Sequence, residues 1–146
     1  MDDIDLEILR SLKRDARKSY RDIAEKLGVA EGTVYNRIKK LLENGVLKGF
    51  IADIDYSKLG FDITAVIGIV VEGGHLLEIE REMSRASCVS AVYDVTGEYD
   101  ALIVAKFRKR EELNDFIKEL LANRYVKRTY TMFVLNIFKE EHGVEF

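Results

Sequence analysis

Residues 30–44 read AEGTVYNRIKKLLEN, and this stretch decides how the first third of the chain is organised. At about 100° per residue, Val34, Ile38 and Leu41 fall on one side of a helix, next to Leu42. The opposite side carries small, polar and basic residues, namely Gly32, Thr33, Asn36, Lys39 and Lys40. The spacing therefore predicts an amphipathic helix that buries one face and offers the other face to a partner.

Two further helices are predicted ahead of this stretch. Residues 3–13 have apolar side chains at helical spacing and acidic residues at the start, where the helix dipole favours negative charge. A second helix begins at Ser19, with Asp22 as a capping-box-like partner, and ends at Gly28. Two amphipathic helices joined by a short turn around a glycine form the helix-turn-helix pattern. We therefore expect a winged-type helix-turn-helix domain at residues 1–49.

The remaining residues predict a linker and a second domain. Residues 50–61 favour extended structure and are expected to form a linker strand. The elements expected after it are strands at 63–71, 89–96, 101–107 and 126–138, and helices around 76–83 and 113–121. This βαββαβ order is the ferredoxin-like pattern, here spanning residues 62–146. The predicted fold class is therefore α+β.

The first, third and fourth of these strands are apolar at nearly every residue. A sheet with helices on one face would alternate polar and apolar residues if its other face met water. The same face of a second copy is the economical cover, so we expect a two-fold dimer through sheet-to-sheet packing.

The formal net charge of −3 is unevenly distributed along the chain. Residues 1–50 hold 11 Lys and Arg against 9 Asp and Glu, whereas residues 51–146 hold 12 against 17. With a sequence pI near 5.5, indiscriminate nucleic-acid binding is disfavoured. Any DNA contact should therefore be local and strengthened by oligomerisation.

Several sequence features point to a cytoplasmic protein without a membrane segment or cofactor. The apolar run at 63–71 is far shorter than the roughly 20 residues of a membrane helix, and the acidic start is unlike a signal peptide. One cysteine, Cys88, cannot form an intramolecular disulfide, and His75 and His142 are too far apart in sequence to suggest a metal site. We expect Cys88 to be a small buried apolar residue.

The chain resembles the leucine-responsive regulator (Lrp/AsnC) family, the feast/famine transcription regulators of bacteria and archaea. The motifs that carry the likeness are Ile4-Asp5, Asp15-Ala16-Arg17, Ile23-Ala24, Leu27-Gly28, Thr33-Val34, Arg37-Ile38 with Leu41, Gly45-Val46-Leu47, and Gly97-Glu98-Tyr99-Asp100. The resemblance implies an N-terminal domain that binds double-stranded DNA and a C-terminal domain that forms homodimers and higher rings such as octamers. It also implies a small effector, commonly an amino acid, bound near Gly97 between dimers.

Two departures from the family pattern stand out. Ala30 replaces the serine that usually caps the recognition helix, which leaves an amide uncapped at a cost of about 1 kcal/mol. Arg124-Tyr125 replaces the usual Pro-Gly before the last strand, so the loop geometry there does not carry over.

The polar face of residues 30–44 is expected to enter the major groove. Asn36 suits a bidentate contact to adenine, and Thr33 and Tyr35 suit a thymine methyl or a phosphate. Arg37 lies only about 60° from the buried side, so it either contacts DNA or pairs with a carboxylate. The other expected DNA-contacting residues are Ser19, Arg21, Gly32, Lys39 and Lys40, although the two lysines could simply form a solvated helix face.

The stretch 97–100 is the expected effector site. Gly97 can adopt a positive φ and leave backbone amides open to a carboxylate, while Glu98 and Asp100 suit an ammonium. By spacing alone this stretch is a hairpin turn, and the resemblance favours a ligand site. The predicted effector-binding residues are Gly97, Glu98, Tyr99, Asp100, Thr129 and Thr131, with Tyr93 and Asp94 as weaker candidates.

Two other functions are compatible with a similar fold. Some proteins that resemble this family decarboxylate sirohaem-type tetrapyrroles, but the chain has no phosphate loop and no Ser or Cys nucleophile with an obvious base, so we do not expect an enzyme. An RNA-binding module of the same βαββαβ order would stack bases on strand aromatics. Phe107, Phe133 and Phe138 lie among aliphatic residues without basic neighbours, which favours a core or dimer face.

Overall fold

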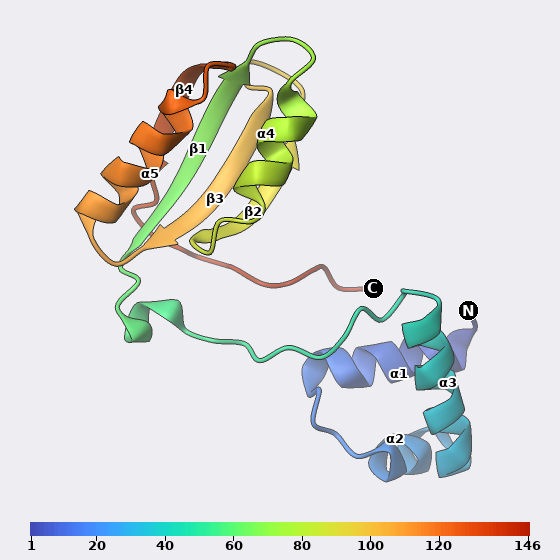
Figure 1. Cartoon of the computed structure of the whole chain (residues 1–146). Coiled ribbons are helices and arrows are strands. Elements are labelled where there is room, and N and C mark those ends of the chain that lie inside the picture. The colour runs from blue at the N-terminus through green and yellow to red at the C-terminus, as the bar shows by residue number, and fades with distance from the viewer. The chain divides into compact units, whose positions relative to one another are not determined.

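The computed structural model describes residues 1–146 and divides them into two compact units (Figure 1). The first unit contains residues 1–54 together with 143–146, and the second contains residues 55–142. Helices make up the first unit, and a four-stranded sheet with helices makes up the second, which confirms the predicted α+β class. The four C-terminal residues, expected in the second domain, belong instead to the first unit, where Arg10 and Lys13 donate hydrogen bonds to their carbonyl groups.

The first unit consists of α1 (Asp3–Arg14), α2 (Tyr20–Leu27) and α3 (Glu31–Glu43), close to the predicted ranges. Local signals set their ends. The Asp2 and Asp5 side chains form a capping box at the start of α1. The hydroxyl of Ser19 accepts a hydrogen bond from the amide of Asp22 at 3.0 Å at the start of α2. Gly28, with φ of 68°, ends α2 in the left-handed conformation.

The core of the first unit consists of apolar side chains from all three helices. Ile8, Ile23 and Val34 are fully buried, and the other buried members are Leu12, Ala24, Ile38 and Leu41. Each helix contributes the apolar face that its sequence period predicts. The polar residues of α3 are therefore left outside this core.

Residues 50–61 do not form the predicted linker strand. They contain no strand, and Tyr56–Leu59 form the short 3-10 helix η1. The Asp55 carboxylate accepts hydrogen bonds from the amide and hydroxyl of Ser57, which closes this turn locally. No strand lies in the first unit either, so the predicted wing is absent.

The second unit is built on an antiparallel sheet with strand order β2-β3-β1-β4. Its elements in chain order are β1 (Ile63–Val71), α4 (Leu76–Met83), β2 (Val89–Asp94), β3 (Ala101–Phe107), α5 (Arg110–Ala122) and β4 (Val126–Phe133). The last strand is five residues shorter than predicted. After Val134 donates to the carbonyl of Thr64, no part of β1 remains for β4 to pair with, because β1 begins at Ile63.

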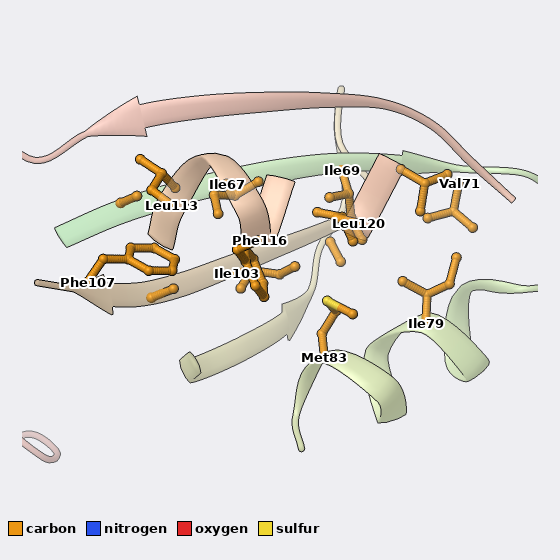
Figure 2. Packing of buried hydrophobic residues seen from close by; sticks show 14 residues of the cluster. Ile67, Ile69, Val71, Ile79, Met83, Ile103, Phe107, Leu113, Phe116 and Leu120 are labelled. Atoms are coloured by element: carbon orange, nitrogen blue, oxygen red, sulfur yellow. The ribbon is translucent and has the colours of Figure 1, made fainter. Parts of the chain in front are cut away.

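Helices α4 and α5 pack on the same face of this sheet (Figures 1 and 2). Ile67 and Ile69 of β1 and Ile103 of β3 are fully buried beneath them, together with Ile79 of α4 and Leu120 of α5. The alternate residues of β1 and β3 point to the opposite face, which no element of the unit covers. The sheet is thus sealed by helices on one side only.

Candidate functional sites

The first site is the polar face of α3. Gly32, Tyr35 and Asn36 are exposed, as are Lys39 and Lys40, and Thr33 is half-buried. Tyr35 has 54% of its surface exposed, although its ring approaches that of Tyr20 with centroids 6.4 Å apart. An exposed polar helix face supported by a packed core is the geometry with which helix-turn-helix proteins enter a major groove.

Arg37 of α3 pairs with carboxylates of α1. Its Nη1 lies 2.7 Å from Oδ2 of Asp2 and 3.2 Å from Oδ1 of Asp5. The pKa of Asp2 is lowered, first by the hydrogen bond from the amide of Asp5 and then by Arg37, and the pKa of Arg37 is raised by Asp2. Of the two roles left open for Arg37, the structure has the pairing with a carboxylate, and we remove Arg37 from the DNA-contacting set.

The start of α3 is uncapped, as its alanine predicts. Ala30 occupies the N-cap position with extended backbone dihedrals and makes no side-chain hydrogen bond. Ser19 and Arg21, the expected phosphate contacts on α2, are both exposed. Ser19 already caps its own helix, and Arg21 lies 3.1 Å from Glu25 in a surface ion pair.

The second site is the turn at 97–100, between β2 and β3. Gly97 has φ of 118°, which other residues rarely adopt. The ring of Tyr99 covers Gly68 of β1 and lies 5.3 Å from the ring of Tyr130. Glu98 is exposed and forms no ion pair. The turn is therefore held against the sheet by Tyr99, with Glu98 open to solvent.

Asp100 holds the turn to the sheet. Its Oδ2 accepts a hydrogen bond from the amide of Val71 at 2.7 Å, at the register shift between Val70 and Val71. Its own amide donates to the carbonyl of Ile69 at 2.9 Å. The carboxylate that we expected to receive an ammonium is thus engaged by the backbone, which makes Asp100 a positioning residue.

Thr129 and Thr131 do not share a face with Tyr99. They lie opposite Ile69 and Ile67 of β1, whose side chains are buried beneath the helices. Residues directly opposite in an antiparallel pair point to the same face, so both threonines lie on the helix side of β4. Within one chain, the predicted effector residues therefore lie on two sides of the sheet.

Sequence reasoning missed Arg128. It lies opposite Val70 on the uncovered face, with its guanidinium carbon 5.3 Å from the centre of the Tyr130 ring, and it forms no salt bridge. The alternation of Arg128, Tyr130 and Met132 along the last strand was the available signal. Tyr93 lies on the same face opposite Leu102, whereas Asp94 lies near Glu80 of α4.

Other singled-out residues carry local structure. His75 stacks on Tyr125 with ring centroids 3.4 Å apart, where the loop lacks the family's Pro-Gly. Cys88 is half-buried and packs against the core, and burial raises the pKa of its thiol. No group of three or more metal-ligating side chains is present. No helix has the length and apolar character needed to span a membrane.

Comparison with known proteins supports both halves of this description. The family model of the AsnC-type helix-turn-helix domain matches residues 1–42, and that of the Lrp/AsnC ligand binding domain matches residues 64–144. An uncharacterized HTH-type transcriptional regulator of Pyrococcus furiosus is 50% identical over 145 residues, which cover 99% of this chain and 98% of the relative.

Solved structures agree on the fold. AsnC of Escherichia coli has a TM-score of 0.90 at 25% identity, with 97% of each chain covered. A transcriptional regulator of Neisseria meningitidis in complex with L-methionine has a TM-score of 0.90 at 22% identity, covering 99% of this chain and 96% of its own. The chain therefore belongs to the Lrp/AsnC family and is a transcriptional regulator with a helix-turn-helix DNA-binding domain and a ligand-binding domain.

Proposed function

We propose that the exposed face of α3 reads the operator sequence and that an amino acid controls the assembly of the regulator. The observation that carries the first part is the exposure of Asn36 on a helix whose other face is fully packed. An Asn amide can bond both N6 and N7 of adenine, which specifies a base. Tyr35 and Thr33 border this contact, while Lys39 and Lys40 neutralise phosphates and position the helix.

Two substitutions separate reading from positioning. Asn36→Ala should change the order of preference among operator variants, because it removes the base contact. Lys40→Ala should weaken binding to specific and random DNA alike and lower the salt slope of log K by about 0.9 for each phosphate lost. Lys118→Ala, on the exposed side of α5, is the matched control and should change neither quantity. Equal losses on specific and random DNA for Asn36→Ala would refute its reading role.

The uncovered sheet face is proposed to pair with the same face of a second copy. Tyr130 and Met132 on this face are 39% and 42% exposed in the single chain, and Val66 and Val104 lie beside them. Such a contiguous apolar face marks an interaction surface. Dimers made this way would assemble further into rings and place several copies of α3 on one operator.

Sedimentation tests this assembly. Val66→Lys places a charge at the centre of the face and should shift the protein to a monomer at micromolar concentration. Leu77→Lys, at a 58% exposed position on α4, should leave the assembly unchanged. A wild-type chain that sediments as a monomer would overturn the dimer.

The proposed effector is a free amino acid bound near the turn at 97–100. Glu98 and Arg128 supply charges of both signs without salt-bridge partners, which suits an ammonium and a carboxylate. The Neisseria relative was solved with L-methionine, which supports this ligand class. Because Thr129 and Thr131 lie on the other side of the sheet, we place the site between dimers, where another copy brings its own residues to the turn.

An effector held between dimers would act by favouring one assembly over another, limited by its difference in affinity for the two. A thermal-shift screen of the twenty amino acids tests this, because ligand at 100 times its Kd stabilises the native state by about 2.7 kcal/mol. Glu98→Gln and Arg128→Gln should each remove the shift, whereas Lys118→Gln should not. A shift that survives both substitutions would place the site elsewhere.

A further inference from the structure

A groove of about 390 Å³ lies in the first unit, between the end of α1 and the start of α2. It is separate from the polar face of α3 and from the turn at 97–100. Four of its lining side chains are basic, two carry hydroxyl groups and two are acidic: Arg14, Arg17, Lys18 and Lys26, Ser11 and Ser19, and Asp15 and Asp22. None of the basic residues was among the expected DNA contacts.

Ser11 is the unusual member of this groove. The residue is 4% exposed, and its Oγ atom has no hydrogen-bond partner. A buried hydroxyl without a partner costs about 1–3 kcal/mol, and most buried polar atoms in folded proteins are paired. An unpaired hydroxyl that lines a groove therefore indicates a polar group that binds there.

The start of α2 provides amide donors beside it. The Ser19 hydroxyl caps the amide of Asp22 at 3.0 Å, and the amide of Ile23 donates to the Ser19 carbonyl at 3.1 Å. The first two amides of the helix have no acceptor within it, and the positive end of the helix dipole points the same way. Helix starts of this kind bind phosphate.

The charges of the groove also favour an anion. Arg14, Arg17 and Lys18 form no salt bridge, so their charges are uncompensated in the folded chain. Only Lys26 is paired, with Glu7 at 3.4 Å. Of the two acids, Asp15 is engaged locally, since its Oδ1 accepts from the amide of Arg17 at 2.9 Å.

We propose that this groove binds a phosphate group, with Arg17 and Arg14 as the charged ligands and Ser11 as a hydroxyl donor from the floor. Phosphate is the anion whose several oxygens can use guanidinium, ammonium, hydroxyl and amide donors together. The phosphate belongs either to the backbone of the bound operator or to a free phosphate compound. The first source rests on the proposed DNA reading, and the second does not.

Two measurements on the full chain distinguish these sources. In the first, inorganic phosphate is titrated calorimetrically at low ionic strength into wild type, Arg17→Gln and Ser11→Ala. In the second, operator affinity is measured over a range of salt concentrations for the same proteins. Lys118→Gln is the control for loss of one exposed positive charge.

A DNA phosphate predicts that Arg17→Gln weakens binding to all sequences and lowers the salt slope by about 0.9 per phosphate released. A free phosphate predicts saturable heat with wild type that Arg17→Gln abolishes, with an unchanged salt slope. In either case Ser11→Ala should weaken the corresponding binding about two- to tenfold. It should leave the unfolding midpoint unchanged or raised, because it removes an unpaired polar atom; a purely structural hydroxyl would lower the midpoint.

The proposal fails if inorganic phosphate gives no saturable heat and neither variant changes the operator affinity or its salt slope. Failure of the DNA-reading proposal has a different signature, namely that Asn36→Ala leaves sequence preference intact. The calorimetric titration contains no DNA and therefore tests the groove independently of that result.

Discussion

The ring of Tyr99 lies so close to Gly68 that a Cβ on residue 68 would stand 2.8 Å from the Cγ and Cδ1 atoms of the ring. Gly68→Ala therefore has to displace Tyr99 and the turn that it anchors. Forced overpacking of this kind costs about 1–3 kcal/mol, which denaturant titration of the variant should detect. Gly73→Ala is the control, because a Cβ there meets no atom within 4 Å.

Asp100→Ala should destabilise the second unit by about 1–3 kcal/mol, because it leaves the buried amide of Val71 without an acceptor. Asp100→Asn keeps an oxygen in the same place and should retain most of the stability. Equal losses in the two variants, measured by denaturant titration, would show that the charge and not the hydrogen bond holds the turn.

Ala30→Ser should stabilise the first unit by about 1 kcal/mol, because the N-cap of α3 has suitable backbone dihedrals but no side-chain acceptor. Ser19→Ala is the reciprocal change and should cost about the same amount by removing the cap of α2. Amide hydrogen exchange within each helix would check both effects, and an unchanged exchange rate in α3 of Ala30→Ser would contradict the prediction.

The Asp2 carboxylate makes the first unit sensitive to acid. Its pKa in the folded chain lies below the ordinary value of 3.8, so its contribution is present above about pH 4 and is lost as the pH falls through the lowered pKa. Asp2→Asn should therefore be less stable than wild type at pH 7, and the difference should shrink below pH 4. Hydrogen exchange of the α1 amides across this range is the measurement.

Glu80 should have the opposite pH dependence. Burial first, and then the charge of Asp94, raise the pKa of its carboxyl above the ordinary 4.5. The folded chain therefore loses stability as the pH rises through this raised pKa. Glu80→Gln should melt higher than wild type at pH 7 and like wild type at pH 4. Asp94→Asn should give a smaller shift in the same direction, because burial is the larger cause.

Signals local in sequence predicted most helix and strand boundaries. The apolar period placed α3 within one residue of its observed ends, Ser19 and Gly28 marked the ends of α2, and Ala30 predicted an uncapped start. These features depend on hydrogen bonds and packing within a few residues, so the chain encodes them without knowledge of its partners.

Contacts between distant residues decided the sites. The sequence left two roles open for Arg37, and only the packing of α3 on α1 placed it against Asp2 and Asp5. The expected linker strand failed because a strand needs a paired neighbour, whereas the 3-10 turn after Asp55 closes with local bonds alone.

The turn at 97–100 shows the same division. The sequence by itself determined that Gly97 would turn the chain between two strands and that its neighbours carry charge. The tertiary structure decided that Asp100 binds the backbone of β1, that Tyr99 covers Gly68, and that Thr129 lies on the other side of the sheet. The physical reason is register: one residue of shift in strand pairing moves every side chain to the opposite face, and composition alone does not specify that shift.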